Sequence, residues 1–166
     1  AQDNEYKIPI PAVETNAVEK VVSKENTLFI VEDDQEVREY LRVLLSPDYN
    51  IVVVENGEEA IDRLEMELPE LIVSDVVMPR KDGYELCKTI KTSADWGRIP
   101  IILLTAKNDM DSSIKGLDCG ADAYVGKPFD PFYLKAVINN LLENRKRMQW
   151  IVQLSLIHIS EPTRQA

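Results

Sequence analysis

Acidic side chains directly follow two short apolar segments of the sequence. The run Glu32–Asp34 comes after Leu28–Val31, and Asp75 comes after Leu71–Ser74. A single aspartate after a strand is more often the cap of a helix. This explanation fits less well here, because two strands are followed by acidic residues. Carboxylates that lie close together repel one another unless a cation joins them, and their oxygens suit a hard divalent ion such as Mg²⁺. The pattern therefore predicts an acidic pocket that binds a cation.

A hydroxyl group and an ammonium group follow two further apolar segments. Thr105 comes directly after Ile99–Leu104, and Lys127 comes shortly after Ala123–Val125. Taken alone, each residue is better explained as an ordinary strand-end threonine or a surface lysine. Their joint placement with the carboxylates favours a site that all of these residues share.

The elements that must position these side chains are short strands and amphipathic helices, which alternate from about Asn26 onward. Besides the four apolar segments above, Ile51–Val54 is a fifth predicted strand. Helical faces are predicted in five stretches: Gln35–Leu45, Glu58–Glu67, Tyr84–Lys91, Met110–Cys119 and Pro131–Arg147. Apolar strands that are each followed by a helix form a parallel sheet buried on both faces. The predicted fold class is therefore α/β, a doubly wound (βα)5 architecture with a five-stranded parallel sheet, whose site forms at the carboxyl ends of the strands.

The chain divides into a linker, one domain and a tail. Residues 1–26 are polar, contain Pro9 and Pro11 and lack sustained periodicity, which predicts a linker. Residues 27–147 form the predicted domain, and its last helix is expected to close at the basic run Arg145–Arg147, since cations favour the C-terminal end of a helix. Residues 148–166 break the pattern and have two open interpretations, a non-native extension or the start of a following segment.

The composition excludes some classes of function. The 166 residues include 29 acidic and 19 basic side chains, a formal net charge of −10. This charge repels phosphate backbones, so we expect no direct nucleic acid binding by this chain. Cys87 and Cys119 lack disulfide or zinc spacing and are expected to be free thiols. No apolar run suits a membrane segment and no signal peptide is evident, so a cytoplasmic setting is expected, although a longer parent protein could be membrane-anchored.

The ordered set of motifs resembles the response-regulator receiver domains of bacterial two-component signalling systems, over roughly residues 26–147. The matching motifs are Ile30-Val31-Glu32-Asp33, Asp75 with Met78-Pro79 and Asp82-Gly83 after it, Thr105-Ala106, and Lys127-Pro128-Phe129. The spacing also agrees, with 30 residues from Asp75 to Thr105 and 52 from Asp75 to Lys127. The resemblance implies a flavodoxin-like receiver fold and a role in phosphorelay signal transduction.

By this resemblance, Asp75 is the phosphoacceptor and Mg²⁺ is the cofactor. Glu32 and Asp33 help to hold the ion, with Asp33 the more direct ligand, and Asp75 and the main-chain carbonyl of Val77 supply further ligands. Lys127 shields the phosphoryl oxygens, since phosphoryl transfer depends mainly on positioning and charge neutralisation. The expected product is an aspartyl phosphate.

The resemblance also implies a conformational switch and partners. Thr105 and Tyr124 match the family's switch pair, in which the hydroxyl moves towards the phosphoryl group and the aromatic ring turns into the vacated space. The alternative for Tyr124 is a tyrosine packed at the sheet edge. The Lys127–Pro128 bond is usually cis in the family. The implied partners are a histidine kinase phosphodonor domain, a downstream output domain or protein, and a second copy in a phosphorylation-dependent dimer.

Two other functions are consistent with some of these residues. A Mg²⁺-dependent phosphatase or phosphotransferase with an aspartate nucleophile typically carries a second aspartate two residues later, where this chain has Val77, so we expect no enzyme acting on external substrates. A domain that serves only as an interaction scaffold is disfavoured, because every expected site position holds a residue that can perform the role expected there. The flanks suggest a domain cut from a longer chain such as a hybrid histidine kinase. Because the only histidine, His158, lies in the tail, the phosphodonor must be another domain or protein.

Overall fold

Five parallel strands form one sheet in the part of the chain that the structure describes. The computed structural model describes residues 24–106 and 119–160. The strands are β1 (Thr27–Val31), β2 (Asn50–Val54), β3 (Leu71–Asp75), β4 (Ile101–Ala106) and β5 (Ala123–Lys127). They lie in the order β2-β1-β3-β4-β5, and every neighbouring pair is parallel. The strand order reverses between β1 and β3, so the predicted doubly wound parallel sheet is confirmed.

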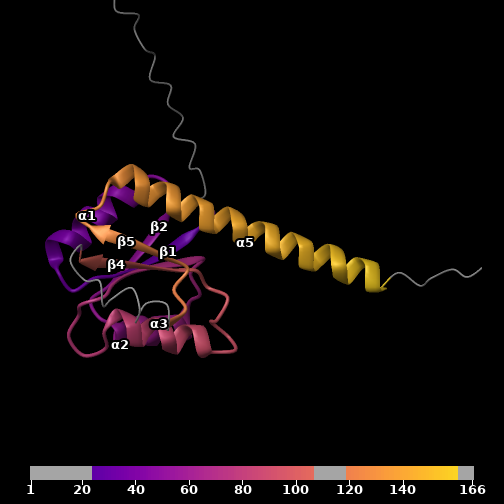
Figure 1. Ribbon diagram of the computed structural model, residues 1–166, viewed down its shortest axis with the longest axis horizontal. Coiled ribbons are helices and arrows are strands. Elements are labelled where there is room, and N and C mark those ends of the chain that lie inside the picture. Colours follow the sequence, from indigo (N-terminus) through magenta and orange to yellow (C-terminus); the bar gives the residue numbers. More distant parts are fainter. Residues whose placement is uncertain (1–23, 107–118, 161–166) are drawn as a thin grey trace, which may run out of the picture.

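Helices cover both faces of this sheet. The helices are α1 (Gln35–Leu45), α2 (Gly57–Met66), α3 (Gly83–Thr92) and α5 (Pro131–Ser160). Figure 1 shows α1 and α5 on one face and α2 and α3 on the other. The first three confirm the predicted helices to within a residue at each end. The predicted helix Met110–Cys119 lies almost entirely outside the described residues.

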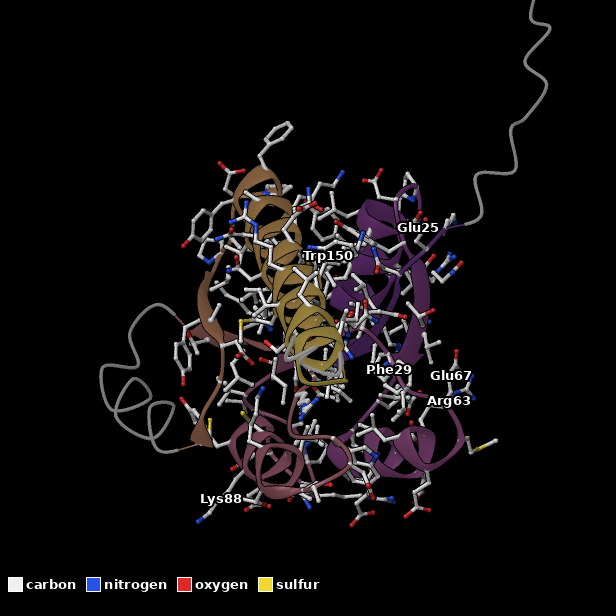
Figure 2. All side chains as sticks on the ribbon, turned by 90° about the vertical axis from the view of Figure 1, so that its right-hand side faces the viewer. Glu25, Phe29, Arg63, Glu67, Lys88 and Trp150 are labelled. Carbon is white, nitrogen blue, oxygen red and sulfur yellow. The ribbon has the colours of Figure 1, made fainter. Side chains whose placement is uncertain are left out.

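The core has two layers because neighbouring residues of a strand point to opposite faces. In β1, Leu28 and Ile30 pack with α1 and α5, whereas Phe29 and Val31 pack with α2 and α3. All four side chains are fully buried, and Figure 2 shows Phe29 on the side of α2. Such nearly continuous apolar strands are what a sheet covered on both faces requires.

Three polar residues fix where the helices after β1, β2 and β3 begin. The side chains of Asp34, Asn56 and Asp82 accept hydrogen bonds from backbone N–H groups in the first turns of α1, α2 and α3. These N–H groups have no partner within the helix, so each cap stabilises its helix by about 1 kcal/mol. Asp34 is thus a helix cap, and Glu32 and Asp33 are the acids of this run that remain available for the site.

β4 begins two residues later than the predicted strand Ile99–Leu104. Its first residue is Ile101, directly after Pro100. Proline has no N–H to donate to a neighbouring strand, although its carbonyl oxygen still accepts a hydrogen bond from the Ile72 amide, 2.9 Å away. The strand can therefore start only after the proline.

The C-terminal helix is longer than predicted. α5 continues to Ser160, so the expectation that it closes at Arg145–Arg147 is wrong. No glycine or proline lies between Pro131 and Ser160, and a basic run does not by itself end a helix. The helix projects beyond the sheet (Figure 1). The described helices include none with the length and hydropathy to cross a membrane, and the division into a domain at 27–147 and a tail at 148–166 stays a prediction.

Removing the residues after Arg147 is expected to leave the stability of the domain unchanged. Every side chain from Met148 to Ile157 is exposed, whereas Ile138 and Leu142 are buried. We expect the shortened chain to have a free energy of unfolding within about 0.5 kcal/mol of the full chain, measured by denaturant titration. A chain shortened before Leu142 should lose about 2 kcal/mol or more. A comparable loss after the first truncation would show that the projecting part of α5 belongs to the folded domain.

Candidate functional site

Three carboxylates meet at the carboxyl edge of the sheet. Glu32 and Asp33 directly follow β1, and Asp75 is the last residue of β3. One carboxylate oxygen from each of the three residues lies within 4.8 Å of the other two. β1 and β3 are paired neighbours, so the cluster forms where the strand order reverses. The sequence-predicted acidic pocket is therefore assembled in the structure.

Strand alternation explains why the charged side chains meet. Glu32, Asp75 and Lys127 each lie two residues after a strand residue of the core layer under α1 and α5. Those strand residues are Ile30, Val73 and Val125. Side chains two positions apart in a strand point to the same face. The charged residues thus continue one apolar layer at the point where it reaches the surface.

The ammonium group of Lys127 joins two of the carboxylates. Its Nζ atom lies 3.2 Å from Oε2 of Glu32 and 3.1 Å from Oδ1 of Asp75. Lys127 is the last residue of β5, and its peptide bond to Pro128 is cis, in agreement with the expectation from the sequence. The structure thus brings a cation from the edge strand to the acidic cluster.

Burial governs the protonation of this cluster. The side chain of Glu32 is 1% exposed. Its burial, together with the nearby charge of Asp75, raises the pKa of the Glu32 carboxyl to about 7, although Lys127 acts in the opposite direction. Burial lowers the pKa of the Lys127 ammonium, but the charges of Asp75 and Glu32 outweigh this effect and raise that pKa overall. Near neutral pH the pocket therefore favours a bound proton, or a further cation in addition to Lys127.

The loop after β3 holds Asp75 through backbone contacts. Oδ1 of Asp75 accepts a hydrogen bond from the Val76 amide, 2.9 Å away, and the carbonyl of Val76 accepts one from the Gly83 amide, 2.8 Å away. A Cβ atom on Gly83 would lie 2.3 Å from the carbonyl oxygen of Asp75. Only glycine allows α3 to begin this close to the end of β3. Sequence reasoning missed this contact, because a glycine after Asp82 is equally consistent with an ordinary turn.

Replacing Gly83 by alanine is expected to lower the free energy of unfolding by about 2 kcal/mol, because the added Cβ would overlap backbone atoms of β3. Gly126 in β5 offers a matched control, since a Cβ there would meet nothing within 4 Å. Gly126→Ala should change the stability by less than about 0.5 kcal/mol. Denaturant titration of both variants measures the difference, and equal effects would contradict the role of the close approach.

Thr105 and Tyr124 belong to the opposite face of the sheet. In the pairing of β4 with β5, Leu103 lies opposite Tyr124, and Thr105 follows Leu103 on the same face. The ring of Tyr124 is partly buried in the layer towards α2 and α3, with its hydroxyl oxygen 4.0 Å from the sulfur of Cys119. Cys87 and Cys119 are both buried, and neither forms a disulfide within the described residues. Tyr124 therefore points inward, and Thr105 continues its layer towards the edge where Asp75 lies.

The oxygen cluster has the chemistry and spacing for one small divalent cation. Octahedral Mg²⁺ binds oxygens at about 2.1 Å, so that oxygens on opposite sides of the ion are about 4.2 Å apart. The carboxylate oxygens of Glu32, Asp33 and Asp75 lie within 4.8 Å of one another, close to this requirement. An all-oxygen set favours hard cations over softer transition metals. These three residues can therefore form part of a divalent cation site.

The metal-free domain is expected to lose stability as the pH rises from 4.5 to about 7, the range between the ordinary and the raised pKa of Glu32. In this range the folded state binds the proton more tightly than the unfolded state, so loss of the proton favours unfolding. Glu32→Gln, which resembles the neutral carboxyl, should therefore raise the melting temperature in EDTA at a pH well above 7. Glu65→Gln, at an exposed position of α2, is the matched control. No gain from Glu32→Gln relative to this control would contradict the prediction.

Comparison with known proteins identifies the family. Residues 28–139 match the family model described as the response regulator receiver domain. The chain is 37% identical over 151 residues to Histidine kinase P4 of Formosa agariphila, covering 88% of this chain and 11% of that protein. It is 36% identical over 122 residues to Response regulator Rre1 of Synechocystis, covering 72% of this chain and 53% of that protein. A solved signal receiver domain of a signal transduction histidine kinase from Syntrophus aciditrophicus is 39% identical, with a TM-score of 0.71, covering 74% of this chain and 93% of that one.

The chain belongs to the response-regulator receiver domains of two-component systems, a family that acts in phosphorelay signal transduction. A solved response regulator from Chloroflexus aurantiacus, 37% identical with a TM-score of 0.68, has the same fold over 71% of this chain and 98% of that one. The predicted flavodoxin-like receiver fold is thereby confirmed. The chain spans about half the length of the response regulators that it matches and about a tenth of the histidine kinase.

Proposed function

We propose that this receiver accepts a phosphoryl group on Asp75 from a phosphohistidine of a histidine kinase and passes the signal to an output domain or protein. The observation that carries the proposal is the arrangement around Asp75. Its carboxylate lies 3.1 Å from the Lys127 ammonium and shares an oxygen cluster with Glu32 and Asp33. Phosphoryl transfer needs a positioned nucleophile and positive charge beside the transferred oxygens, and this edge of the sheet offers both.

Mg²⁺ is the cofactor that we propose for the acidic cluster. Glu32, Asp33, Asp75 and the main-chain carbonyl of Val77 would hold the ion, with Asp33 a more direct ligand than Glu32. When bound, Mg²⁺ neutralises charge on the phosphoryl oxygens and reduces their repulsion by the carboxylates. The spacing of the carboxylate oxygens and the raised pKa of Glu32 support the assignment, since a bound cation replaces the proton that Glu32 otherwise holds.

Asp75 forms the new bond in the proposed reaction. One of its carboxylate oxygens attacks the phosphorus atom of the donor, the bond from phosphorus to the histidine nitrogen breaks, and that nitrogen keeps the electron pair. The product is an aspartyl phosphate. Lys127 lies within reach of the same oxygens, and its raised pKa keeps its ammonium group charged at neutral pH.

A change on the face that carries Tyr124 is the proposed output of this reaction. The hydroxyl of Thr105 would move towards the acceptor oxygens of the phosphoryl group, and the ring of Tyr124 would turn into the space that it leaves. The shared face of the two residues in the pairing of β4 with β5 supports this proposal. A phosphorylation-dependent dimer stays a prediction.

We further propose that the chain is a regulatory domain whose chemistry is limited to taking up a phosphoryl group on Asp75 and losing it again. The position two residues after Asp75 holds Val77, whose side chain is 70% exposed and has no proton to exchange. An enzyme that turns over external phosphate esters through an aspartate needs an acid or base for the leaving group. The absence of such a group at Val77 favours slow loss of the phosphoryl group over rapid turnover.

Incubation with Mg²⁺ and acetyl phosphate is expected to add one phosphoryl group to the wild-type chain, measured as intact mass. Asp75→Asn or a chelator should abolish the gain. Asp82→Asn is the matched control, because Asp82 caps α3 in the same loop and asparagine also caps helices well. In the phosphorylated wild type, the ring resonances of Tyr124 should shift, and they should stay in place in a phosphorylated Thr105→Ala variant.

Other outcomes of this experiment would favour the rival functions. No gain in mass, with acetyl phosphate or with a phosphorylated kinase domain, would indicate an interaction scaffold. Rapid consumption of acetyl phosphate without accumulation of the phosphorylated chain would indicate an enzyme.

A further inference from the structure

Arg38, in the first turn of α1, reaches back to the loop that carries two of the clustered acids. Its Nη1 atom donates to the carbonyl oxygen of Glu32 at 3.0 Å and makes a longer contact of 3.5 Å with the carbonyl oxygen of Asp33. Its Nη2 atom lies 3.6 Å from a carboxylate oxygen of Glu55, at the end of β2. The side chain of Arg38 is only 17% exposed. One guanidinium group thus connects the loops after β1 and β2.

These contacts fix the peptide groups of the acidic loop from two sides. The amide of Glu32 donates to the carbonyl of Val54, 3.1 Å away, while the carbonyl of Glu32 accepts from Arg38. On the far side of the loop, Asp34 caps α1. Arg38 therefore contacts the carbonyl oxygens of Glu32 and Asp33 from a position outside the ladder of hydrogen bonds within the sheet.

The acidic loop needs such an anchor because its side chains repel their neighbour on β3. One carboxylate oxygen each of Glu32, Asp33 and Asp75 lies within 4.8 Å of the other two. Outward movement of the loop by even an ångström or so would relieve the repulsion, and it would also separate the oxygens that a cation must contact together. The carbonyl contacts of Arg38 oppose this movement without adding a group to the pocket itself.

We propose that Arg38 is a positioning residue of the divalent cation site, which holds the carbonyl groups of Glu32 and Asp33 so that their carboxylates stay beside Asp75. This inference rests on the proposed function, in which the three carboxylates bind Mg²⁺. Arginine suits the role because its planar fork serves several acceptors at once, whereas the single nitrogen of lysine cannot reproduce that geometry.

The test measures how strongly Mg²⁺ stabilises the wild-type chain, Arg38→Ala, Arg38→Lys and Glu55→Gln. A ligand that binds only the folded state raises its stability according to the ratio of free ligand to dissociation constant, so thermal unfolding over a series of Mg²⁺ concentrations yields the affinity. Substitution of a residue that orients metal ligands typically lowers the affinity for the metal by about tenfold or more. We therefore expect Arg38→Ala to need about tenfold more Mg²⁺ than wild type for the same rise in melting temperature.

The other two variants separate positioning from charge and from general stability. Arg38→Lys keeps the charge and the aliphatic stem but loses the fork, so it should fold and still bind Mg²⁺ several-fold more weakly than wild type. Glu55→Gln removes only the ion pair with a carboxylate that is 64% exposed, and it should bind Mg²⁺ as wild type does.

Each contrary result has its own meaning. A merely structural role would lower the melting temperature equally with and without Mg²⁺ and leave the affinity unchanged in both Arg38 variants, which would overturn the inference. A wild-type chain that Mg²⁺ does not stabilise at all would overturn the proposed metal site, and the positioning role with it. If Arg38→Ala fails to fold, the affinity of Arg38→Lys decides the question.

Discussion

The repulsion between the buried carboxylate of Glu32 and the negative charge of Asp75 is the physical constraint on which the arrangement of the site depends. An almost fully buried acid normally gives up its charge, and the pKa of about 7 for Glu32 reflects that tendency. The proposed cation site needs this charge to be available, although the same charge lowers the stability of the metal-free domain. The pairing of β1 with β3, where the strand order reverses, brings the two acids together.

Supports from three different elements oppose this repulsion. Lys127 brings a positive charge from β5 to both acids. Gly83 allows α3 to begin in close contact with the backbone of Asp75. Arg38 donates a hydrogen bond to the carbonyl of Glu32 in the loop after β1. Because these supports come from separate parts of the sequence, the site depends on the complete fold rather than on any local motif. The side chains of the site also divide between the two faces of the sheet, since Glu32, Asp75 and Lys127 continue one core layer while Thr105 and Tyr124 belong to the other.

The sequence predicted the site best where the type of a residue and its position at the end of a strand indicated the same role. Glu32, Asp75 and Lys127 could be placed at one edge because charged residues directly after apolar strands have few other roles in a parallel sheet. Gly83 and Arg38 could not be assigned in this way, because each acts through contacts with backbone atoms, which leave no pattern in the sequence. The basic run near Arg145 suggested a helix end, but the same residues also suit a helix that continues: Arg145 donates to the carbonyl of Glu70, 2.6 Å away. The pKa of Glu32 depends on burial, which sequence alone does not give.

The two ends of the folded domain lie together at the sheet edge opposite the carboxylates. Just before β1, Glu25 pairs with Lys146 of α5 at 3.5 Å, and the carbonyl of Lys24 accepts a hydrogen bond from the side-chain amide of Asn50, 2.8 Å away. The backbone therefore enters the domain and leaves its packed part at neighbouring points. Beyond the ion pair with Glu25, α5 projects further in the same direction (Figure 1). The helix therefore leads the chain away from the edge that carries the carboxylates and leaves that edge uncovered by α5 after Arg147.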